Sequence, residues 1–158
     1  MKHWFNRFFC YGFMVLLIGG CACRTVSLST QQEPQTVDFR ELNNYFVRND
    51  VPKEGLTTYI YTQEHFDALF GMAAFMGPKG TPSAIDFNHE AVLAVISAPL
   101  NQSCTLTATE VVKEEETLVF RYVETRGDPL TYTIRPCLLI AIPKSAIGLN
   151  PAISFQQQ

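Results

Sequence analysis

Tryptophan and histidine are scarce in this 158-residue chain, which has one tryptophan and three histidines. Trp4 lies near the N-terminus, so a chain that begins at Cys21 lacks the side chain most often used to stack on sugars. His65 and His89 follow Cys21, but neither has neighbours at a spacing typical of metal sites. The sequence also lacks a phosphate-binding glycine loop and a serine nucleophile elbow. We therefore expect no metal and no cofactor.

Positive charge is also scarce. The chain has 12 lysines and arginines against 15 aspartates and glutamates, a formal net charge of -3. Lys2 and Arg7 precede Cys21 and no acidic residue does, so a chain starting at Cys21 keeps 10 basic and 15 acidic residues, net -5. Nucleic-acid binding needs a basic stripe along which the phosphates can lie. We therefore expect no nucleic acid among the partners.

No apolar run is long enough to cross a bilayer. The run FFCYGFMVLLIGG at residues 8–20 contains three glycines and is shorter than the roughly 20 residues that a spanning helix needs. It follows a short positive region formed by Lys2, His3 and Arg7. A basic region before a short apolar core is typical of a signal peptide.

The segment Ile18-Gly19-Gly20-Cys21 resembles the lipobox of bacterial lipoproteins, in which an aliphatic residue and two small residues precede a cysteine. The resemblance implies that residues 1–20 are a signal peptide and that the Cys21 thiol carries fatty acyl chains such as palmitate. Each buried methylene contributes about 0.8 kcal/mol, so two or three chains anchor a protein durably. An ordinary secretory signal with incidental cysteines is the alternative.

Residues 21–36 are expected to form a flexible tether, because this segment is polar, aperiodic and contains Pro34. Ala22 stands where an aspartate is associated with inner-membrane retention of lipoproteins. The resemblance therefore implies an outer-membrane anchor in the cell envelope. The tether lacks the acidic cluster that some Bacteroidetes lipoproteins use for surface export, which favours the periplasm-facing side.

A chain of 158 residues is long enough for one domain and not comfortably for two, and residues 37–158 are predicted to form that domain. Two uninterrupted apolar runs, AVLAVIS at 91–97 and CLLIAI at 137–142, predict central strands buried on both faces. Between them, residues 104–112 and 117–125 predict an antiparallel hairpin. The expected fold is α+β, a single curved antiparallel sheet packed against one main helix in a sandwich-like arrangement.

The main helix is predicted to begin after Thr62, because threonine is favoured at the N-cap. Apolar residues recur at helical spacing from Phe66 to Ala73 and form one stripe. The other expected elements are a helical turn at 38–42, strands at 45–47 and 56–62, loops at 74–84, 99–103 and 126–130, and an edge strand in the last residues.

Cys104 and Cys137 are predicted at the starts of two strands. In the oxidising envelope, a disulfide between them is expected to stabilise the fold by about 3–4 kcal/mol. Two unpaired thiols are the alternative, and a cysteine nucleophile paired with a histidine is the third interpretation. His65 is expected on the helix surface. His89 precedes Glu90, a pair too common to indicate a metalloenzyme, and the nearby carboxylates are predicted to cap a loop.

Residues 57–143 contain, in order, a strand, a helix reading TQEHFDALF, a loop, IDF before the buried strand VLAVIS, a hairpin, and a last apolar strand ending in LLIAIPK. This order resembles the C-terminal domain of the PrcB protease-complex subunit family. The resemblance implies an extracytoplasmic, non-catalytic protein that stabilises or regulates a protease. Where the family has a glycine-rich start to the strand after VLAVIS, this chain reads PLNQSCTLT. Residues 37–56 have no counterpart there, and this variant is most like uncharacterised Bacteroidetes lipoproteins.

The leading hypothesis is a lipid-anchored, non-catalytic module that binds another envelope protein, such as a protease that it stabilises or inhibits. Loops carry recognition on rigid sheets, so 74–83, 99–103 and 126–130 are the predicted contact regions. The candidate contact residues are Phe75, Met76, Leu100, Asn101, Gln102, Arg126 and Asp128. One alternative is an envelope hydrolase that uses Cys104 or a histidine–carboxylate pair. The other is a carrier of a small apolar ligand in a cleft between sheet and helix.

Overall fold

The computed structural model describes residues 33–158 apart from Phe75, Pro78 and residues 148–150. The predicted signal peptide, the lipidation site Cys21 and most of the predicted tether lie outside the described residues, as does the candidate contact residue Phe75. Within the described residues, no helix is both long enough and apolar enough to span a membrane.

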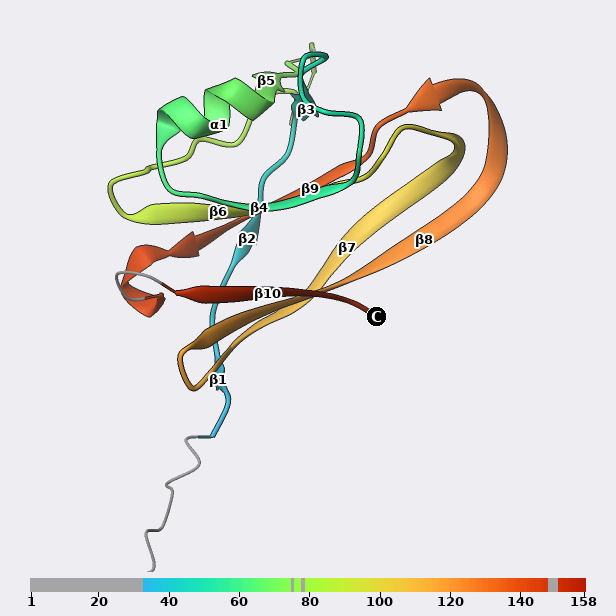
Figure 1. Cartoon of the computed structure of the whole chain (residues 1–158). Coiled ribbons are helices and arrows are strands. Elements are labelled where there is room, and N and C mark those ends of the chain that lie inside the picture. Colours follow the sequence, from blue (N-terminus) through green and yellow to red (C-terminus); the bar gives the residue numbers. More distant parts are fainter. Residues whose placement is uncertain (1–32, 75, 78, 148–150) are drawn as a thin grey trace, which may run out of the picture. The chain divides into compact units, whose positions relative to one another are not determined.

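The described strands form three sheets, labelled A, B and C below (Figure 1). Sheet A contains, in spatial order, β1 (Gln35–Thr36), β7 (Leu100–Glu114), β8 (Thr117–Ile134) and β10 (Ala152–Gln157). Sheet B contains β2 (Arg40–Glu41), β9 (Cys137–Pro143), β6 (Glu90–Ile96) and β4 (Leu56–Ile60). Sheet C pairs β3 (Tyr45–Val47) with β5 (Phe70–Met72), and the described helices are α1 (Gln63–Leu69) and the 3-10 turn η1 (Lys144–Ala146).

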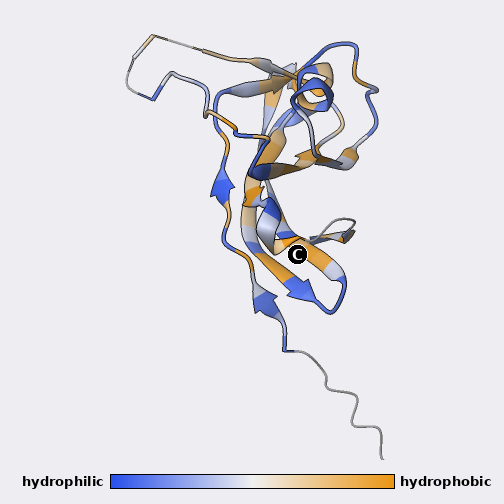
Figure 2. Cartoon of the chain, turned by 90° about the vertical axis from the view of Figure 1, so that its left-hand side faces the viewer, coloured by the Kyte–Doolittle hydropathy of each residue, from blue (hydrophilic) through white to orange (hydrophobic). Residues whose placement is uncertain are grey.

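Sheet B is the middle layer, and hydrophobic side chains pack on both of its faces. Successive residues of a strand point to opposite faces, so β6 and β9 contribute to two cores. One core joins sheet B to sheet A and contains Ala91, Leu93, Val95, Val111, Leu118, Phe120, Leu138, Ile140 and Ile142. The other joins sheet B to α1 and sheet C and contains Val47, Ile60, Phe66, Phe70, Val92, Ala94, Ile96, Leu139 and Ala141. In Figure 2 the hydrophobic colours follow these strands, and the short edge strands β1 and β2 are hydrophilic. The prediction of two strands buried on both faces is confirmed.

The prediction of a single sheet packed against one main helix is wrong. The described residues are mostly β-strand, the strands form several sheets, and α1 has only seven residues. The physical reason is that a strand buried on both faces needs a covering layer on each side. Helix α1 and sheet C cover one face of sheet B, and the β7–β8 hairpin covers the other with Leu118 and Phe120.

Helix α1 begins where predicted and ends earlier. Thr62 is the N-cap, with its Oγ1 accepting a hydrogen bond from the His65 N–H at 3.2 Å. The predicted stripe continues through Phe70 to Ala73, but Phe70 has extended backbone and starts β5, where it pairs with Val47. A Cβ on Gly71 would collide with the Phe46 ring, so glycine lets this ring lie across β5 at the point where β3 and β5 pair. Strand pairing therefore overrides the local helix pattern.

The predicted helical turn at 38–42 is also wrong. Residues 40 and 41 form β2 and pair with Ala141 and Ile140 of β9. The predicted tether ends two residues early, because Gln35–Thr36 forms β1 and pairs with β7. The predicted edge strand at the end of the chain is confirmed as β10, but it runs parallel to β8, so sheet A is mixed.

Strands β7 and β8 are longer than predicted and absorb the predicted loops 99–103 and 126–130. Gln102 lies opposite Pro129, and Cys104 lies opposite Arg126. A proline in a ladder has no N–H to donate, and the register shifts on both sides of Gln102 accommodate it. The Gln102 side chain also donates to the Gly127 carbonyl at 2.6 Å. The segment RGDPL (126–130) has a composition typical of turns, but in the structure it is part of a bulged strand.

Candidate functional site

The two described cysteines are free thiols. Cys104 lies in sheet A, and Cys137 starts β9 in sheet B opposite Ile96. The structure therefore matches the unpaired alternative and contains no Cys104–Cys137 bond. Burial raises the pKa of the Cys137 thiol to about 11 and also raises the pKa of Cys104, with the Glu124 charge adding to it. A nucleophilic cysteine needs a lowered pKa, so neither thiol is arranged for attack.

One histidine–carboxylate pair does form. His89 Nδ1 lies 2.7 Å from Asp86 Oδ2, and both side chains are mostly exposed, at 82% and 55%. Asp86 Oδ1 also accepts from the Asn88 N–H at 3.0 Å, and the His89 hydrogen bond is the main cause of the lowered pKa of Asp86. Asp86 therefore caps the turn before β6, as predicted. In the described part of the chain, no group of three His, Cys, Asp or Glu side chains is placed to hold a metal.

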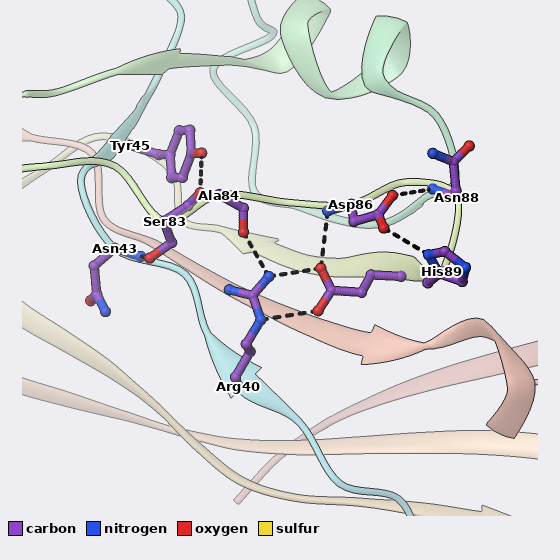
Figure 3. A network of polar contacts seen from close by, with 9 residues as sticks. Arg40, Asn43, Tyr45, Ser83, Ala84, Asp86, Asn88 and His89 are labelled. Atoms are coloured by element: carbon purple, nitrogen blue, oxygen red, sulfur yellow. Dashed lines mark hydrogen bonds and ion pairs between the residues drawn. The ribbon is translucent and has the colours of Figure 1, made fainter.

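A polar network fastens this turn to the edge of sheet B (Figure 3). The Arg40 guanidinium donates to both Glu90 carboxylate oxygens, at 3.0 and 2.7 Å, and to the Ala84 carbonyl at 2.7 Å. Glu90 also accepts from the Asp86 N–H at 3.1 Å. These hydrogen bonds link residues 84, 86 and 90 to β2 and fix the chain from 84 to 90 in place.

Replacing Arg40 with glutamine is expected to lower the free energy of unfolding by about 0.5–1 kcal/mol at neutral pH, because Arg40 is 44% exposed and solvent screens the pair. The Arg40 hydrogen bond is the main cause of the lowered pKa of Glu90. A carboxylate with a lowered pKa in the fold stabilises it above its unfolded pKa, and this contribution is lost on acidification through the folded pKa. Urea unfolding at pH 7 and at about pH 3 should show the difference from wild type shrinking in acid. An unchanged difference at low pH would contradict this assignment.

Large apolar side chains are exposed on sheet C and just after it. Phe46 is 48% exposed, Met72 is 70% exposed and Met76 is fully exposed. By strand alternation Met72 lies on the same face of sheet C as Phe70, which packs against α1, and Phe46 lies on the opposite face. We call Phe46, Met72 and Met76 the apolar tip. Methionine adapts its shape to a partner and is common at protein-binding surfaces.

A cleft of about 380 Å³ opens beside the apolar tip, and we call it the helix cleft. One wall is α1 with Met72, and the other wall is residues 81–85. Its lining side chains include Tyr45, Phe66, Phe70, Met72 and Ile85, with Gln63 and Asp67 from α1. The ligand-carrier hypothesis places a cleft between sheet and helix. The helix cleft is lined by α1 and by Tyr45, Phe70 and Met72 of sheet C, and Phe66 and Phe70 also belong to the core between α1 and sheet B.

Hydrogen bonds from β3 and the residues before it hold the second wall of the helix cleft. The Tyr45 hydroxyl donates to the Ser83 carbonyl at 2.6 Å (Figure 3). The Asn43 N–H donates to the Ser83 Oγ at 3.0 Å, and the Asn44 amide donates to the Thr81 carbonyl at 2.9 Å. The wall is therefore fixed by a segment some 40 residues earlier in the chain.

The remaining candidate contact residues lie elsewhere, on the β7–β8 hairpin. Asn101 Oδ1 accepts from the Thr133 hydroxyl at 2.6 Å, and Arg126 donates to Glu124 at 2.6 Å. Asp128 is exposed on β8. Leu100 and Arg126 line a second cleft of about 430 Å³, which they share with residues of β4 and β6. The predicted contact residues thus separate into a hairpin group and Met76.

No protein-family model, no curated protein and no solved structure matches this chain. The resemblance to the PrcB family therefore stays a prediction, and the function is argued from the sites themselves. The sequence reasoning missed Phe46, Met72 and Asp67. Met72 lies between Phe70 and Ala73 of the predicted helical stripe, so the sequence pattern does not show that it ends β5 with its side chain exposed.

Proposed function

We propose that this protein is a lipid-anchored, non-catalytic module of the cell envelope that binds another protein through the apolar tip. The observation that carries the proposal is the exposure of two methionines and a phenylalanine on sheet C and just after it. Burying one such side chain contributes about 1.5–3 kcal/mol, and the isolated domain does not gain this energy. Exposed apolar patches mark protein-interaction sites, and Met76 follows Met72, the last residue of β5, by four positions.

The proposed location in the cell envelope determines which partner proteins can reach the apolar tip. Acyl chains on Cys21 anchor the protein in the outer membrane, facing the periplasm, and the tether gives the domain reach from that surface. Confinement to one membrane raises the effective concentration of the domain for a partner in the same compartment. The resemblance of residues 57–143 to protease-complex subunits makes an envelope protease the preferred partner, which the domain stabilises or inhibits.

The arrangement of the reactive side chains supports a non-catalytic role. His89 and Asp86 form an exposed pair that caps a turn, and Asp86 is the only side-chain partner of the His89 ring among the described residues. The Cys104 and Cys137 thiols have raised pKa values, the opposite of what a nucleophile needs. The hydrolase hypothesis therefore has less support than protein binding.

Replacing Met72 and Met76 together with serine is expected to reduce the partner recovered with the protein from solubilised membranes by about tenfold or more. The fold should be unaffected, because both side chains are exposed and such substitutions change stability by about 0.5 kcal/mol or less. The measurement is quantitative mass spectrometry of proteins that co-purify with the wild type and with the double variant.

Tyr132→Ser is the matched control, because Tyr132 is 62% exposed but lies on the β7–β8 hairpin. This variant should recover the partner as the wild type does. Equal recovery by wild type and double variant would contradict the proposal, as would the absence of any partner above background with the wild type.

A further inference from the structure

The helix cleft is apolar inside and carries one acidic side chain. Tyr45 and Phe66 meet edge to face with ring centroids 5.0 Å apart, and Phe66 and Phe70 lie 5.1 Å apart. Met72 and Ile85 add aliphatic surface. An extended hydrocarbon chain therefore finds apolar contacts on both walls of the cleft.

Asp67 supplies the negative charge. It lies on the exposed side of α1, one turn after Gln63, whose amide donates to Asp67 Oδ1 at 2.7 Å. The ion pairs among the described residues do not include Asp67. Asp67 also helps to raise the pKa of the Tyr45 hydroxyl, after burial as the main cause, so its charge acts within the cleft.

Two arginines that hydrogen-bond to residues lining the helix cleft are already engaged. Arg40, whose charge also acts on Tyr45, is held by both oxygens of Glu90 and by the Ala84 carbonyl. Arg48 donates to the Phe70 carbonyl at 3.2 Å. The Asp67 carboxylate therefore lacks a cationic partner among the described residues.

We propose that the helix cleft receives a lysine or arginine side chain of the partner protein, with the aliphatic stem between the walls and the cationic end at Asp67. Long basic side chains combine an apolar stem with a charged end, and this cleft presents the complementary pair of features. The aromatic rings add attraction for a cation. The inference rests on the proposed function in one respect, because the basic side chain belongs to the protein that covers the apolar tip.

The test uses the detergent-solubilised full chain with carbon-13 methyl labels on methionine. Met72 lines the helix cleft and Met76 does not, so the two methyl signals separate cleft binding from general surface effects. The probes are the methylamides of Nα-acetyl-lysine and Nα-acetyl-arginine. The reference probe is Nα-acetyl-norleucine methylamide, which has the lysine stem without the ammonium group.

The lysine and arginine probes are expected to shift the Met72 methyl signal in a saturable way and to leave Met76 unchanged. The norleucine probe should bind more weakly than the lysine probe, by a factor of up to about five. Asp67→Asn should weaken the binding of the basic probes by a similar factor. Glu64→Gln is the matched control, because it removes the same charge from an exposed position on α1 that does not line the cleft. It should leave the titration unchanged.

Equal binding of the lysine and norleucine probes, or no Met72 shift with either basic probe, would overturn the inference. So would equal weakening by Asp67→Asn and Glu64→Gln. These results are independent of the capture experiment. If the methionine double variant loses a partner and the basic probes do not shift the Met72 methyl signal, only the cleft inference fails. If no partner is recovered and the probes bind, only the proposed function fails.

Discussion

Replacing Cys21 with serine is expected to abolish acyl labelling of the protein and to release it from the membrane fraction. The thiol is the group that lipoprotein processing acylates, and a serine hydroxyl does not replace it. At about 0.8 kcal/mol per buried methylene, the loss of two or three acyl chains removes essentially all of the anchoring energy. Incorporation of a labelled palmitate analogue and fractionation of lysed cells measure the two effects.

Cys23→Ser is the control for this experiment, because Cys23 lies two residues after Cys21 and Gly20, not an aliphatic residue, stands three before it. It should keep both the label and the membrane association. Retention of the label by Cys21→Ser would show that residues 18–21 are not the processing site.

Replacing Phe120 with alanine is expected to lower the free energy of unfolding by about 3–5 kcal/mol. Phe120 is fully buried between sheets A and B, with Tyr122 and Phe155 each 5.9 Å away between ring centroids. Truncation removes these contacts and leaves a cavity. Urea unfolding of the full chain in the Cys21→Ser background measures the change.

Tyr132→Ala offers a control on the same strand, since Tyr132 is largely exposed. Its cost should be about 0.5 kcal/mol or less. Similar costs for the two aromatic residues would mean that sheet A does not pack on sheet B, and the layered architecture would be wrong.

The parts of the fold that the sequence predicts are those decided locally. The apolar runs of β6 and β9 show that both faces are buried, and Thr62 marks the start of α1. These apolar runs do not show which elements cover the two faces of sheet B. The prediction of one sheet and one helix is wrong for this reason. The end of α1 depends on pairing between Phe70 and Val47, which lies 23 positions earlier in the sequence.

In the candidate site, too, the sequence predicts the features that depend on local residues and not those that depend on distant pairing. Met76 is predicted as a contact residue in the loop at 74–83, and its side chain is fully exposed in the structure. Leu100 and Arg126 are predicted in the loops 99–103 and 126–130, but the long β7–β8 pairing holds both in strands. The helix cleft is not predictable locally, because its second wall depends on the hydrogen bond from Tyr45 to Ser83, 38 positions apart.

The central claim, that the apolar tip binds another envelope protein, is tested most directly by photo-crosslinking in intact cells. A photoreactive amino acid replaces Met76 in the full chain with Cys21 intact, and a second chain carries it at Tyr132. We predict one crosslinked species of constant mass from position 76 and none from position 132. The absence of a crosslink from position 76, or the same species from both positions, would contradict the account.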